Sequence, residues 1–448
     1  MKHFKGAMRE QGLLIPHDLT EWLPGNHLAR FIVEIVDKLD FSKVYSQYKG
    51  KGSAAYDPKL LLGLLFYGYS TGVFSSRKIE HATYDSVAFR FISGNHHPDH
   101  DTIAYFRKRF LGEIKGWFKE ILLIGKELGL VKLGTIYIDG TKIQANASRH
   151  KAMSYAYMKR MEEQLEGEIA RLLELGAAQD EKEKDQQPDI PAELSLRKDR
   201  HQKILEAKKV IEQRAAERYQ QEQKEFELQQ QKRTEQEQRT GKKPRGRKAK
   251  APENKVDGAD QYNFTDPQSR IMKTPNGFDQ CYNAQAAVNE DMLIVGAYSN
   301  THGNDRAEFI PVIASVPQEL GTITQAIADT GYFSENNVIK AQLLDIEPLI
   351  ATSRQKHNNY LEDILDKEQP VIRDTDSVIE KMRKQLKSIQ GRLDYSKRKH
   401  TVEPVFGIIK EVLGFRRFSL RGEVQTDNEW SLVCIAYNLK RLFKLKMA

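Results

Sequence analysis

Hydrophobic residues recur at helical spacing through the first part of the chain. Asp57, followed by a proline, precedes the apolar run 60–66, in the arrangement typical of a helix N-cap and first turn. Asp101 stands in the same way before residues 103–121, where apolar side chains return every three or four positions and predict one buried helical face. We therefore expect an all-α N-terminal domain over residues 1–128.

The basic residues of this predicted domain admit two interpretations. Short helices followed by a longer capped one are typical of a helix-turn-helix, and Arg107, Lys108 and Arg109 would then lie on the helix that reads DNA. The alternative is a helical bundle with a solvated basic face, which has the same pattern. The sequence leaves both open, so all three residues are candidate DNA contacts.

Near residue 134 the pattern changes to that of a strand. Residues 134–148 alternate Ile136 and Ile138 with polar neighbours, which predicts a half-buried strand. Residues 149–256 are charged and rich in glutamine, and their apolar residues form only a thin seam on two long helices. We expect this stretch to be a helical hairpin insert that acts as a solvated spacer and carries no chemistry.

Strands and helices alternate over the rest of the chain. Short apolar runs predict four more strands, the first two joined as a hairpin, at 280–288, 292–298, 324–328 and 348–351. Helices are expected at 305–316, from residue 334, and at 430–443. The predicted fold is α/β, with a mixed sheet flanked by helices and interrupted by the hairpin insert. Its sheet-bearing domain would comprise residues 129–148 and 257–448.

The distribution of charge along the chain also indicates a class of binding partner. Lysine and arginine exceed aspartate and glutamate by 70 − 62 = 8 over 448 residues. The excess is concentrated in two runs: residues 242–250 carry six basic groups and no acid, and residues 381–399 carry eight against Asp394 alone. Local basic runs of this kind favour a polyanionic partner such as DNA.

Cysteine content and hydropathy exclude several classes of protein. Cys281 and Cys434 are the only cysteines, so neither a disulfide framework nor a zinc site built on paired cysteines is expected. No apolar run approaches the roughly 18–20 residues of a membrane span, and the first residues lack the apolar core of a signal peptide. We expect a soluble protein of a reducing cytoplasm, with no membrane partner.

Two aspartates follow predicted strands, each with a glycine close behind. Asp139 ends the strand at 134–148 before Gly140, and Asp329 follows the strand at 324–328 ahead of Gly331. One such acid is explained by a turn or a helix cap. Two in the same sheet, each costly to place after an apolar strand unless solvated or coordinated, favour a metal site.

Glu403 is the third candidate acid, in the segment YSKRKHTVEPVFGIIK. On one continuous helix, Lys399, Glu403, Phe406 and Lys410 would share a face and bring basic groups to both sides of the acid. Pro404 disfavours helix at the residue before it, so Glu403 is expected in a first helical turn. The alternative interpretation is the start of an ordinary amphipathic helix.

Three carboxylates brought together from distant positions suit one chemistry in particular. Two Mg²⁺ ions about 3.5–4 Å apart activate the oxygen nucleophile and stabilise the leaving oxygen when a phosphodiester bond is cut or joined. Magnesium prefers carboxylate oxygens and keeps several waters. A basic protein with three such acids therefore points to metal-dependent chemistry on nucleic acid.

The motifs carrying these residues resemble the DDE transposases of bacterial insertion sequences. The resemblance covers nearly the whole chain and lies in YIDGTKIQANAS, NFTDPQSRIMKT, QCYNAQAAV, IADTGYFS, residues 395–410 and WSLVCIAYNLKRLF. Before them, FYGYSTGVFSSRKIEHA and HDTIAYFRKRF are similar to the helical domain that precedes the catalytic core in one branch of the family.

The resemblance implies an RNase H-like catalytic domain in which Asp139, Asp329 and Glu403 are the catalytic, metal-binding acids. Tyr395 and Lys410 match the family's signature tyrosine and lysine, which contact DNA. Arg398 stands one residue farther from the glutamate than the signature arginine does, and Lys399 has the expected spacing with a different side chain. Both are candidate DNA contacts.

The resemblance also implies cofactors and partners. Two Mg²⁺ ions, replaceable by Mn²⁺, would act with double-stranded DNA that carries the terminal inverted repeats and with target DNA. The enzyme would cut the element's ends and join the freed 3′-hydroxyls to the target as a homodimer on paired ends, associated with the nucleoid. A nuclease of the same fold that cuts without joining, and a domesticated DNA-binding or coiled-coil protein, are the rival interpretations.

Three further features have competing explanations. Arg245 and Arg247 flank Gly246 in KKPRGRKAK, as in an AT-hook that inserts into a narrow minor groove, but a basic linker binding phosphates without selectivity is preferred. The histidines near residue 97 are assigned to a polar loop rather than a metal cluster. Asp305 is an additional acid, interpreted as a turn or cap residue.

Overall fold

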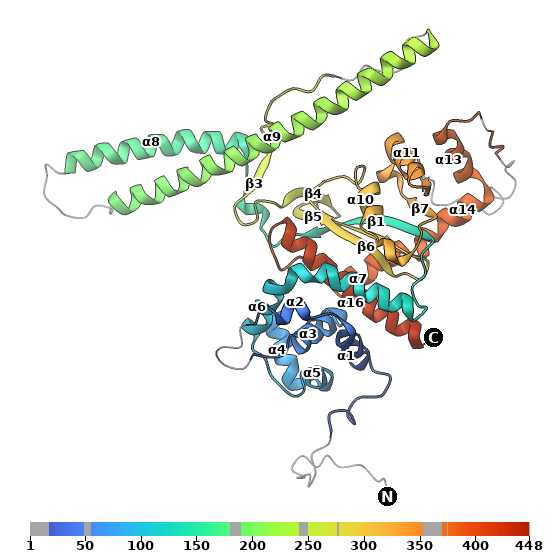
Figure 1. Ribbon diagram of the computed structural model, residues 1–448. Coiled ribbons are helices and arrows are strands. Elements are labelled where there is room, and N and C mark those ends of the chain that lie inside the picture. The colour runs from blue at the N-terminus through green and yellow to red at the C-terminus, as the bar shows by residue number, and fades with distance from the viewer. Residues whose placement is uncertain are drawn as a thin grey trace, which may run out of the picture. The chain divides into compact units, whose positions relative to one another are not determined.

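The computed structural model describes residues 18–48, 55–179, 190–241, 250–275, 277–352, 370–373 and 375–447. The chain divides into two compact units, one formed by residues 1–144 with 282–448 and the other by residues 145–281 (Figure 1). Each unit is described separately below.

The first unit begins with helices only. Helix α3 starts at the predicted position because the Asp57 carboxylate accepts a hydrogen bond of 2.9 Å from the backbone N–H of Lys59 ahead of a first-turn proline. Its sides are buried nearly all round, which places it at the centre of this part of the unit. The helices are α1 (Leu28–Lys38), α2 (Ser42–Tyr45), α3 (Pro58–Ser70), α4 (Ser76–Asp85), α5 (Val87–Ile92), α6 (His100–Phe110) and α7 (Ile114–Glu127).

The single helix predicted from Asp101 to residue 121 is wrong in two respects. The cap is Asp99, whose carboxylate accepts a 2.8 Å hydrogen bond from the backbone N–H of Thr102. A 3-10 turn, η1 (Leu111–Glu113), separates α6 from α7. Leu111 and Ile114 stay buried through this turn, so the apolar spacing that predicted one helix continues across the break.

A mixed sheet forms the second part of this unit. Its strands are β1 (Thr135–Gln144), β5 (Gly277–Val288), β6 (Ile294–Asn300), β7 (Gln325–Ala328) and β8 (Glu347–Ile350), in the order β6-β5-β1-β7-β8. β1 pairs with β7, and β7 with β8, in parallel, whereas β5 and β6 form an antiparallel pair. The predicted mixed α/β architecture is therefore confirmed.

Short helices connect these strands. The helix expected at 305–316 is shorter than predicted, because α10 covers only Phe309–Ala314, and Asp305 lies in the connection before it. The 3-10 turns η3 (Gln318–Leu320) and η4 (Thr330–Tyr332) stand before and after β7, and α11 (Glu335–Leu343) leads to β8.

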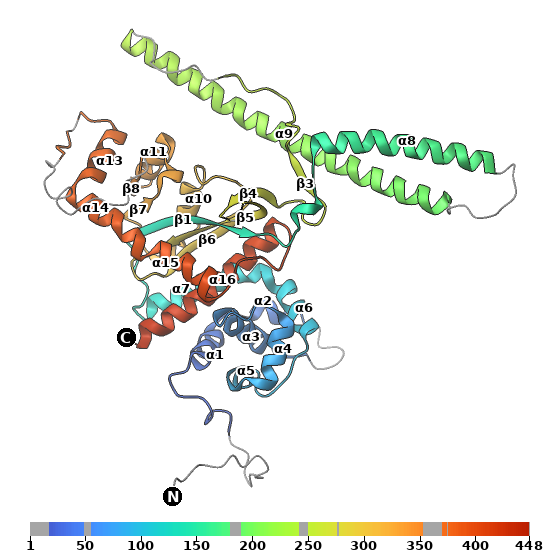
Figure 2. The ribbon, with the colours of Figure 1, turned by 180° about the vertical axis from the view of Figure 1, so that it is seen from behind.

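A buried helix, α16 (Glu423–Met447), joins the two parts of the first unit. It packs against β6 on the sheet and against α3 and α7 among the N-terminal helices (Figures 1 and 2). Its residues 428–439 are all buried, as a helix with apolar neighbours on both sides requires. The N-terminal helices and the sheet therefore share one hydrophobic core.

The chain before α16 is helical but repeatedly interrupted. It contains α13 (Val378–Lys387), α14 (Ile389–Ser396), the 3-10 turn η5 (Lys397–His400), α15 (Val402–Gly407) and the π-helical turn η6 (Ile408–Val412). α15 packs against β1.

In its described residues, the second unit contains two long helices, the strands β2, β3 and β4, and the first residues of β5. α8 (Tyr155–Gln179) packs against α9 (Ile190–Thr240) through a narrow apolar seam that includes Met158, Leu165 and Ile204. β2 (Ala152–Ser154) pairs with β3 (Gln261–Asn263), and β4 (Arg270–Thr274) pairs with the part of β5 that precedes residue 282.

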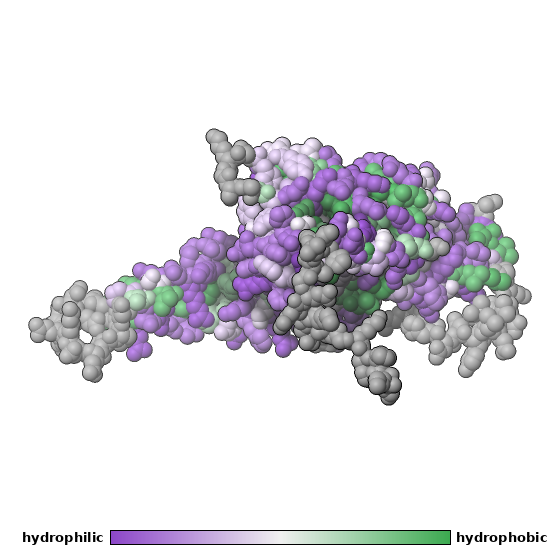
Figure 3. All heavy atoms as spheres, turned by 90° about the horizontal axis from the view of Figure 1, so that it is seen from below, coloured by the Kyte–Doolittle hydropathy of each residue, from purple (hydrophilic) through white to green (hydrophobic). Residues whose placement is uncertain are grey.

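Hydrophobic surface is limited on the face that Figure 3 draws. Hydrophilic residues cover most of it, and hydrophobic residues appear between them in separate groups. Among the described residues, no helix has both the length and the apolar character that crossing a bilayer requires.

Candidate active site

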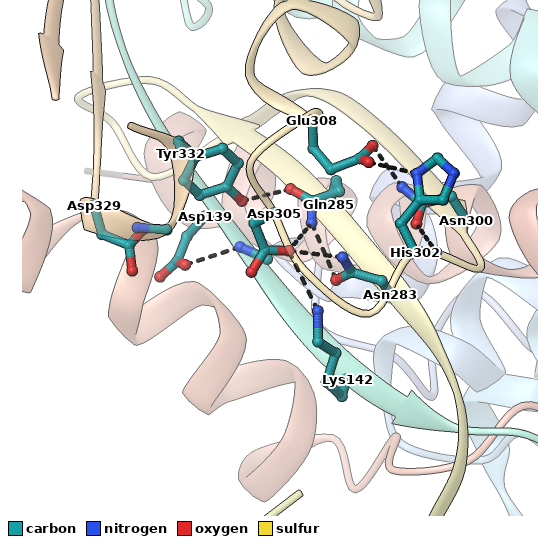
Figure 4. A network of polar contacts seen from close by, with 12 residues as sticks. Asp139, Lys142, Asn283, Gln285, Asn300, His302, Asp305, Glu308, Asp329 and Tyr332 are labelled. Atoms are coloured by element: carbon teal, nitrogen blue, oxygen red, sulfur yellow. Dashed lines mark hydrogen bonds and ion pairs between the residues drawn. The ribbon is translucent and has the colours of Figure 1, made fainter. Parts of the chain in front are cut away.

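The parallel register of β1 and β7 brings the two predicted aspartates together. Ile138, in the middle of β1, is paired with Ala328, the last residue of β7, so the next residues, Asp139 and Asp329, are neighbours (Figure 4). The prediction that Asp139 ends its strand is wrong, because β1 continues to Gln144, whereas Asp329 does follow the carboxyl end of β7, where functional groups of parallel sheets gather.

Backbone N–H groups hold both carboxylates in place. Gly140 donates a 2.8 Å hydrogen bond to Oδ1 of Asp139, and Gly331 donates one of 2.8 Å to Oδ1 of Asp329, which caps η4. Gly140 also permits a close approach, since a Cβ atom there would lie 2.3 Å from Nε2 of the buried Gln285. The glycine is therefore a steric requirement of the site.

Arg398 is the cation nearest to Asp139. Its Nη2 lies 3.3 Å from Oδ2 of Asp139, and its guanidinium carbon lies 5.6 Å from the centre of the Tyr395 ring. The Arg398 side chain is only 6% exposed, so the sequence-predicted DNA contact is turned toward the acid rather than toward solvent. Its ion pair with Asp139 raises the pKa of the guanidinium despite burial.

The pKa of Asp139 is raised to about 7, first of all by burial. The Arg398 charge opposes this shift, and the carboxylates of Asp329 and Asp305 add to it. One guanidinium thus does not compensate this group of acids, and a divalent cation would lower their mutual repulsion.

Glu403 lies exposed in the first turn of α15, which packs against β1. Burial raises the pKa of the half-buried Tyr395, and the charges of Asp329 and Glu403 add to this shift, so both acids act on the same tyrosine. Glu403 lies in the first turn of α15, as Pro404 indicated, so the alternative of one continuous helix through Lys399, Glu403 and Lys410 does not hold. Thr401, with φ −116° and ψ −87°, separates η5 from α15, because the backbone leaves the helical conformation there.

This interruption changes what the basic residues of the segment contact. Arg398 turns inward to Asp139, whereas Lys399 is exposed on η5. Lys410 lies on η6, and its Nζ donates a 3.1 Å hydrogen bond to the backbone carbonyl of Lys142 on β1. The extra residue between Arg398 and Glu403, relative to the family signature, is accommodated by the turn at Thr401.

A fourth acid, Asp305, lies in the same group of side chains, although the sequence suggested only a turn or cap. Its Oδ1 accepts hydrogen bonds from Asn283 and Gln285 on β5 and is 3.3 Å from Nζ of Lys142 (Figure 4). Gln285 also accepts a hydrogen bond from the hydroxyl of Tyr332 in η4. Asn283 and Gln285 stand two positions apart on the otherwise apolar β5, so their side chains share one face of the strand. This pattern was the signal in the sequence that could have indicated the cluster.

The candidate DNA contacts of the N-terminal helices differ in exposure. Arg107 points inward, where Nη1 donates hydrogen bonds to the Tyr69 hydroxyl (3.0 Å) and to the carbonyl of Phe74 (3.2 Å). Lys108 and Arg109 are exposed on α6. The other two candidates, Arg245 and Arg247, lie outside the described residues.

The histidines near residue 97 have local partners. His97 stacks on Tyr84 at a ring distance of 3.9 Å, and His100 pairs with Glu80 at 2.8 Å. In the described part of the chain, only Glu162, Glu166 and His201 bring three potential ligand atoms within 4.8 Å of one another. The donor set around Asp139 still fits Mg²⁺ chemically, because it consists of hard carboxylate oxygens with uncompensated negative charge.

Comparison with known protein families is consistent with this geometry. Residues 17–109 match the family described as Transposase domain (DUF772), and residues 366–443 match the family described as Transposase DDE domain. The second match includes Glu403 and Arg398, while Asp139 and Asp329 lie between the two matched regions. Neither the curated proteins nor the solved structures contain a match to the chain.

The DDE domain match indicates a metal-dependent transposase enzyme, which is the class of protein that the mixed sheet and its group of acids also suit. Together, the two matches support an insertion-sequence DDE transposase, and they confirm the resemblance seen in the sequence.

Proposed function

We propose that this transposase cuts the ends of an insertion sequence and joins the freed 3′-hydroxyls to target DNA at a site made by Asp139, Asp329 and Glu403. The observation that carries the proposal is the parallel register Ile138↔Ala328, which makes Asp139 and Asp329 neighbours. The packing of α15, which carries Glu403, against β1, which carries Asp139, supports the inclusion of Glu403 in the site. We further propose that the sheet is RNase H-like, interrupted between β1 and β5 by the α8–α9 insert.

Asp139, Asp329 and Glu403 would hold two Mg²⁺ ions, or Mn²⁺ in their place, which supply a strong oxygen nucleophile and stabilise the leaving oxygen. The chain's own residues prepare this arrangement. Gly140 and Gly331 fix the orientation of the two aspartates through their N–H groups. Arg398 holds the second oxygen of Asp139 and, being buried, acts as a positioning residue.

DNA would be bound by basic residues and a tyrosine of the first unit. The candidates are Lys399, Lys108 and Arg109, which are exposed, and Tyr395 and Lys410, which are partly buried and close to Glu403 in the chain. Their contacts with phosphates would position double-stranded DNA carrying the terminal inverted repeats, as well as target DNA, without reading sequence. Two ends must be held together before joining, so we propose a homodimer on DNA.

Isosteric replacement of each acid tests the site. Asp139→Asn, Asp329→Asn and Glu403→Gln should each lower Mg²⁺-dependent cleavage of an element end by about 100-fold or more. Loss of a residue that only supports a ligand already costs about 10–100-fold. Binding of the same DNA, measured by gel shift, should change little, because none of the three acids is proposed to contact phosphate.

Matched controls are available in the same unit. Asp291 lies in the turn between β5 and β6, and Glu411 lies exposed on η6, where it pairs with Arg416. Asp291→Asn and Glu411→Gln remove the same charge without touching the proposed site and should cleave normally. Near-normal cleavage by any one of the three site variants would remove that residue from the proposed triad.

A further inference from the structure

Asp305 lies near Asp139, although it comes from a different connection (Figure 4). It follows β6 and precedes α10, and its side chain is 25% exposed. A Cβ atom on Gly140 would lie 3.0 Å from Oδ1 of Asp305, and one on Gly331 would lie 3.8 Å from its Cβ. Asp305 therefore adjoins both glycines that follow the site aspartates.

One oxygen of Asp305 is fixed by buried carboxamides. Oδ1 accepts hydrogen bonds of 2.6 Å from Nδ2 of Asn283 and 2.7 Å from Nε2 of Gln285, and both donors belong to fully buried side chains. Within the part of the chain that the structure describes, Oδ2 has no hydrogen-bond partner. Carboxylates that bind metals are commonly held in this way, with hydrogen bonds to the group that leave an oxygen for the ion.

The carboxamides are themselves held by the surrounding elements. Gln285 accepts a hydrogen bond from the Tyr332 hydroxyl, and its backbone carbonyl accepts a 3.0 Å hydrogen bond from Nε1 of Trp430. Its Nε2 also donates to Oδ1 of Asn283 at 3.0 Å. Burying two amides is costly unless each is fully hydrogen-bonded, so this network has a specific orientation to maintain.

We propose that Asp305 is a fourth carboxylate of the metal site and that its Oδ2 binds the divalent cation held by Asp139. The proposal rests on the proposed function, because it assumes that Asp139 binds metal. It accounts for the buried carboxamides of β5, which a triad alone leaves without a purpose.

The competing explanation is that Asp305 exists to hold Lys142. The Lys142 ammonium is 3.3 Å from Oδ1 and would then serve as the functional cation of the pair. The two explanations predict opposite effects of removing the lysine. If Asp305 binds metal, the ammonium is a competing cation, and its loss leaves metal binding unchanged or tighter. If Asp305 acts through Lys142, the loss of either residue has the same effect.

Mn²⁺ binding to the full-length protein without DNA distinguishes these explanations. Free Mn²⁺ would be measured by electron paramagnetic resonance during titration of the wild type, Asp139→Asn, Asp305→Asn, Lys142→Met and the control Asp291→Asn. The asparagine at 305 keeps an oxygen for the carboxamides and replaces Oδ2 by an amide nitrogen, which does not bind Mn²⁺. Thermal unfolding of each variant checks that it is folded.

We expect Asp139→Asn and Asp305→Asn each to weaken Mn²⁺ binding by about tenfold or more, in line with the cost of disturbing a metal site. Lys142→Met should bind Mn²⁺ at least as tightly as the wild type, and Asp291→Asn should match it. Weakened binding in Asp139→Asn with wild-type binding in Asp305→Asn would overturn this proposal and leave the triad intact. Equal weakening in Lys142→Met and Asp305→Asn would also overturn it. Unchanged binding in Asp139→Asn would overturn the proposed function itself.

Discussion

At the scale of single residues, Asp139 links the chemistry of the site to the stability of the protein. Its pKa is raised from the ordinary 3.8 to about 7 by burial and by neighbouring acids. The folded protein therefore binds a proton that the unfolded chain releases between these two pH values. The wild type should lose stability as pH rises from about 4 to about 7, and the cost is fully present above 7.

This shift predicts that Asp139→Asn stabilises the metal-free protein at alkaline pH. One pKa unit corresponds to about 1.4 kcal/mol, so the upper limit of the gain is about 4 kcal/mol above pH 7. Thermal unfolding in the presence of a chelator should give nearly equal unfolding temperatures for wild type and variant at pH 5, and a higher unfolding temperature for the variant at pH 8. Adding Mg²⁺ at pH 8 should reduce this difference in unfolding temperature. A difference that is the same at both pH values would contradict the assignment of the raised pKa to Asp139.

Arg107 lies on the helix that the sequence suggested for DNA recognition, but its side chain contacts the protein interior. It donates to Tyr69, and its charge opposes the burial that raises the pKa of Glu429 on α16. Glu429 is fully buried and accepts hydrogen bonds from the backbone N–H groups of Ser419 and Leu420. Arg107 therefore connects α6 to the core rather than to DNA.

Removing this cation should destabilise the protein. Arg107→Met leaves the Glu429 carboxylate buried without its positive neighbour, which typically costs about 3–5 kcal/mol. Chemical denaturation should show this loss at pH 8 and a smaller one at pH 4.5, where the carboxyl is more readily protonated. Lys108→Ala, on the exposed side of the same helix, should change stability by no more than about 0.5 kcal/mol. A stable Arg107→Met protein with weakened DNA binding would instead return Arg107 to the DNA surface.

At the scale of elements, the sequence was informative where local chemistry decides the structure. Asp57 and its following proline start α3 as predicted, and Asp139 and Asp329 were recognisable because each apolar run ends in an acid close to a glycine, although β1 continues past Asp139. Asp305 was not recognisable as part of the cluster, since its partners Asn283 and Gln285 come from another strand. The contact between Arg398 and Asp139 was hidden for a similar reason, because it depends on the interruption at Thr401.

The seam between α8 and α9 is a second element whose energetics are open to test. Met158 is completely buried there, whereas Leu196 on α9 is 65% exposed. Met158→Ala should lower the stability of the second unit by about 2–5 kcal/mol, and Leu196→Ala should have little effect. The rate of limited proteolysis within residues 155–240 measures this change in stability. Equal protease resistance of Met158→Ala and wild type would show that the seam does not stabilise the pair.

At the scale of the whole molecule, binding to DNA is expected to involve more than the site. The run 242–250, outside the described residues except for Lys250, carries six basic groups and no acid. Replacing Arg245 and Arg247 by alanine should weaken DNA binding and flatten the log–log dependence on salt by about one unit per lost phosphate contact.

The base composition of the DNA separates the two interpretations of this run. A larger loss on A·T-rich duplex than on G·C-rich duplex of equal length would favour an AT-hook, because a narrow groove concentrates negative potential around arginine. Equal losses would indicate a basic linker without selectivity, which is the expected result. An affinity and salt slope unchanged on both duplexes would show that the run does not touch DNA.

The position of α16 in the chain has a consequence for how the protein is made. This helix packs between β6 and the N-terminal helices, yet it follows β1 to β8 in sequence. A ribosome adds about 5–20 residues per second, so some 15 seconds or more separate the synthesis of α3 from that of its buried partner. Until α16 is made, α3, and later β6 once it has been synthesised, expose the apolar faces that α16 covers. Newborn chains would therefore need a chaperone until the 430s emerge, and the site and the DNA-binding helices would become functional at the same moment.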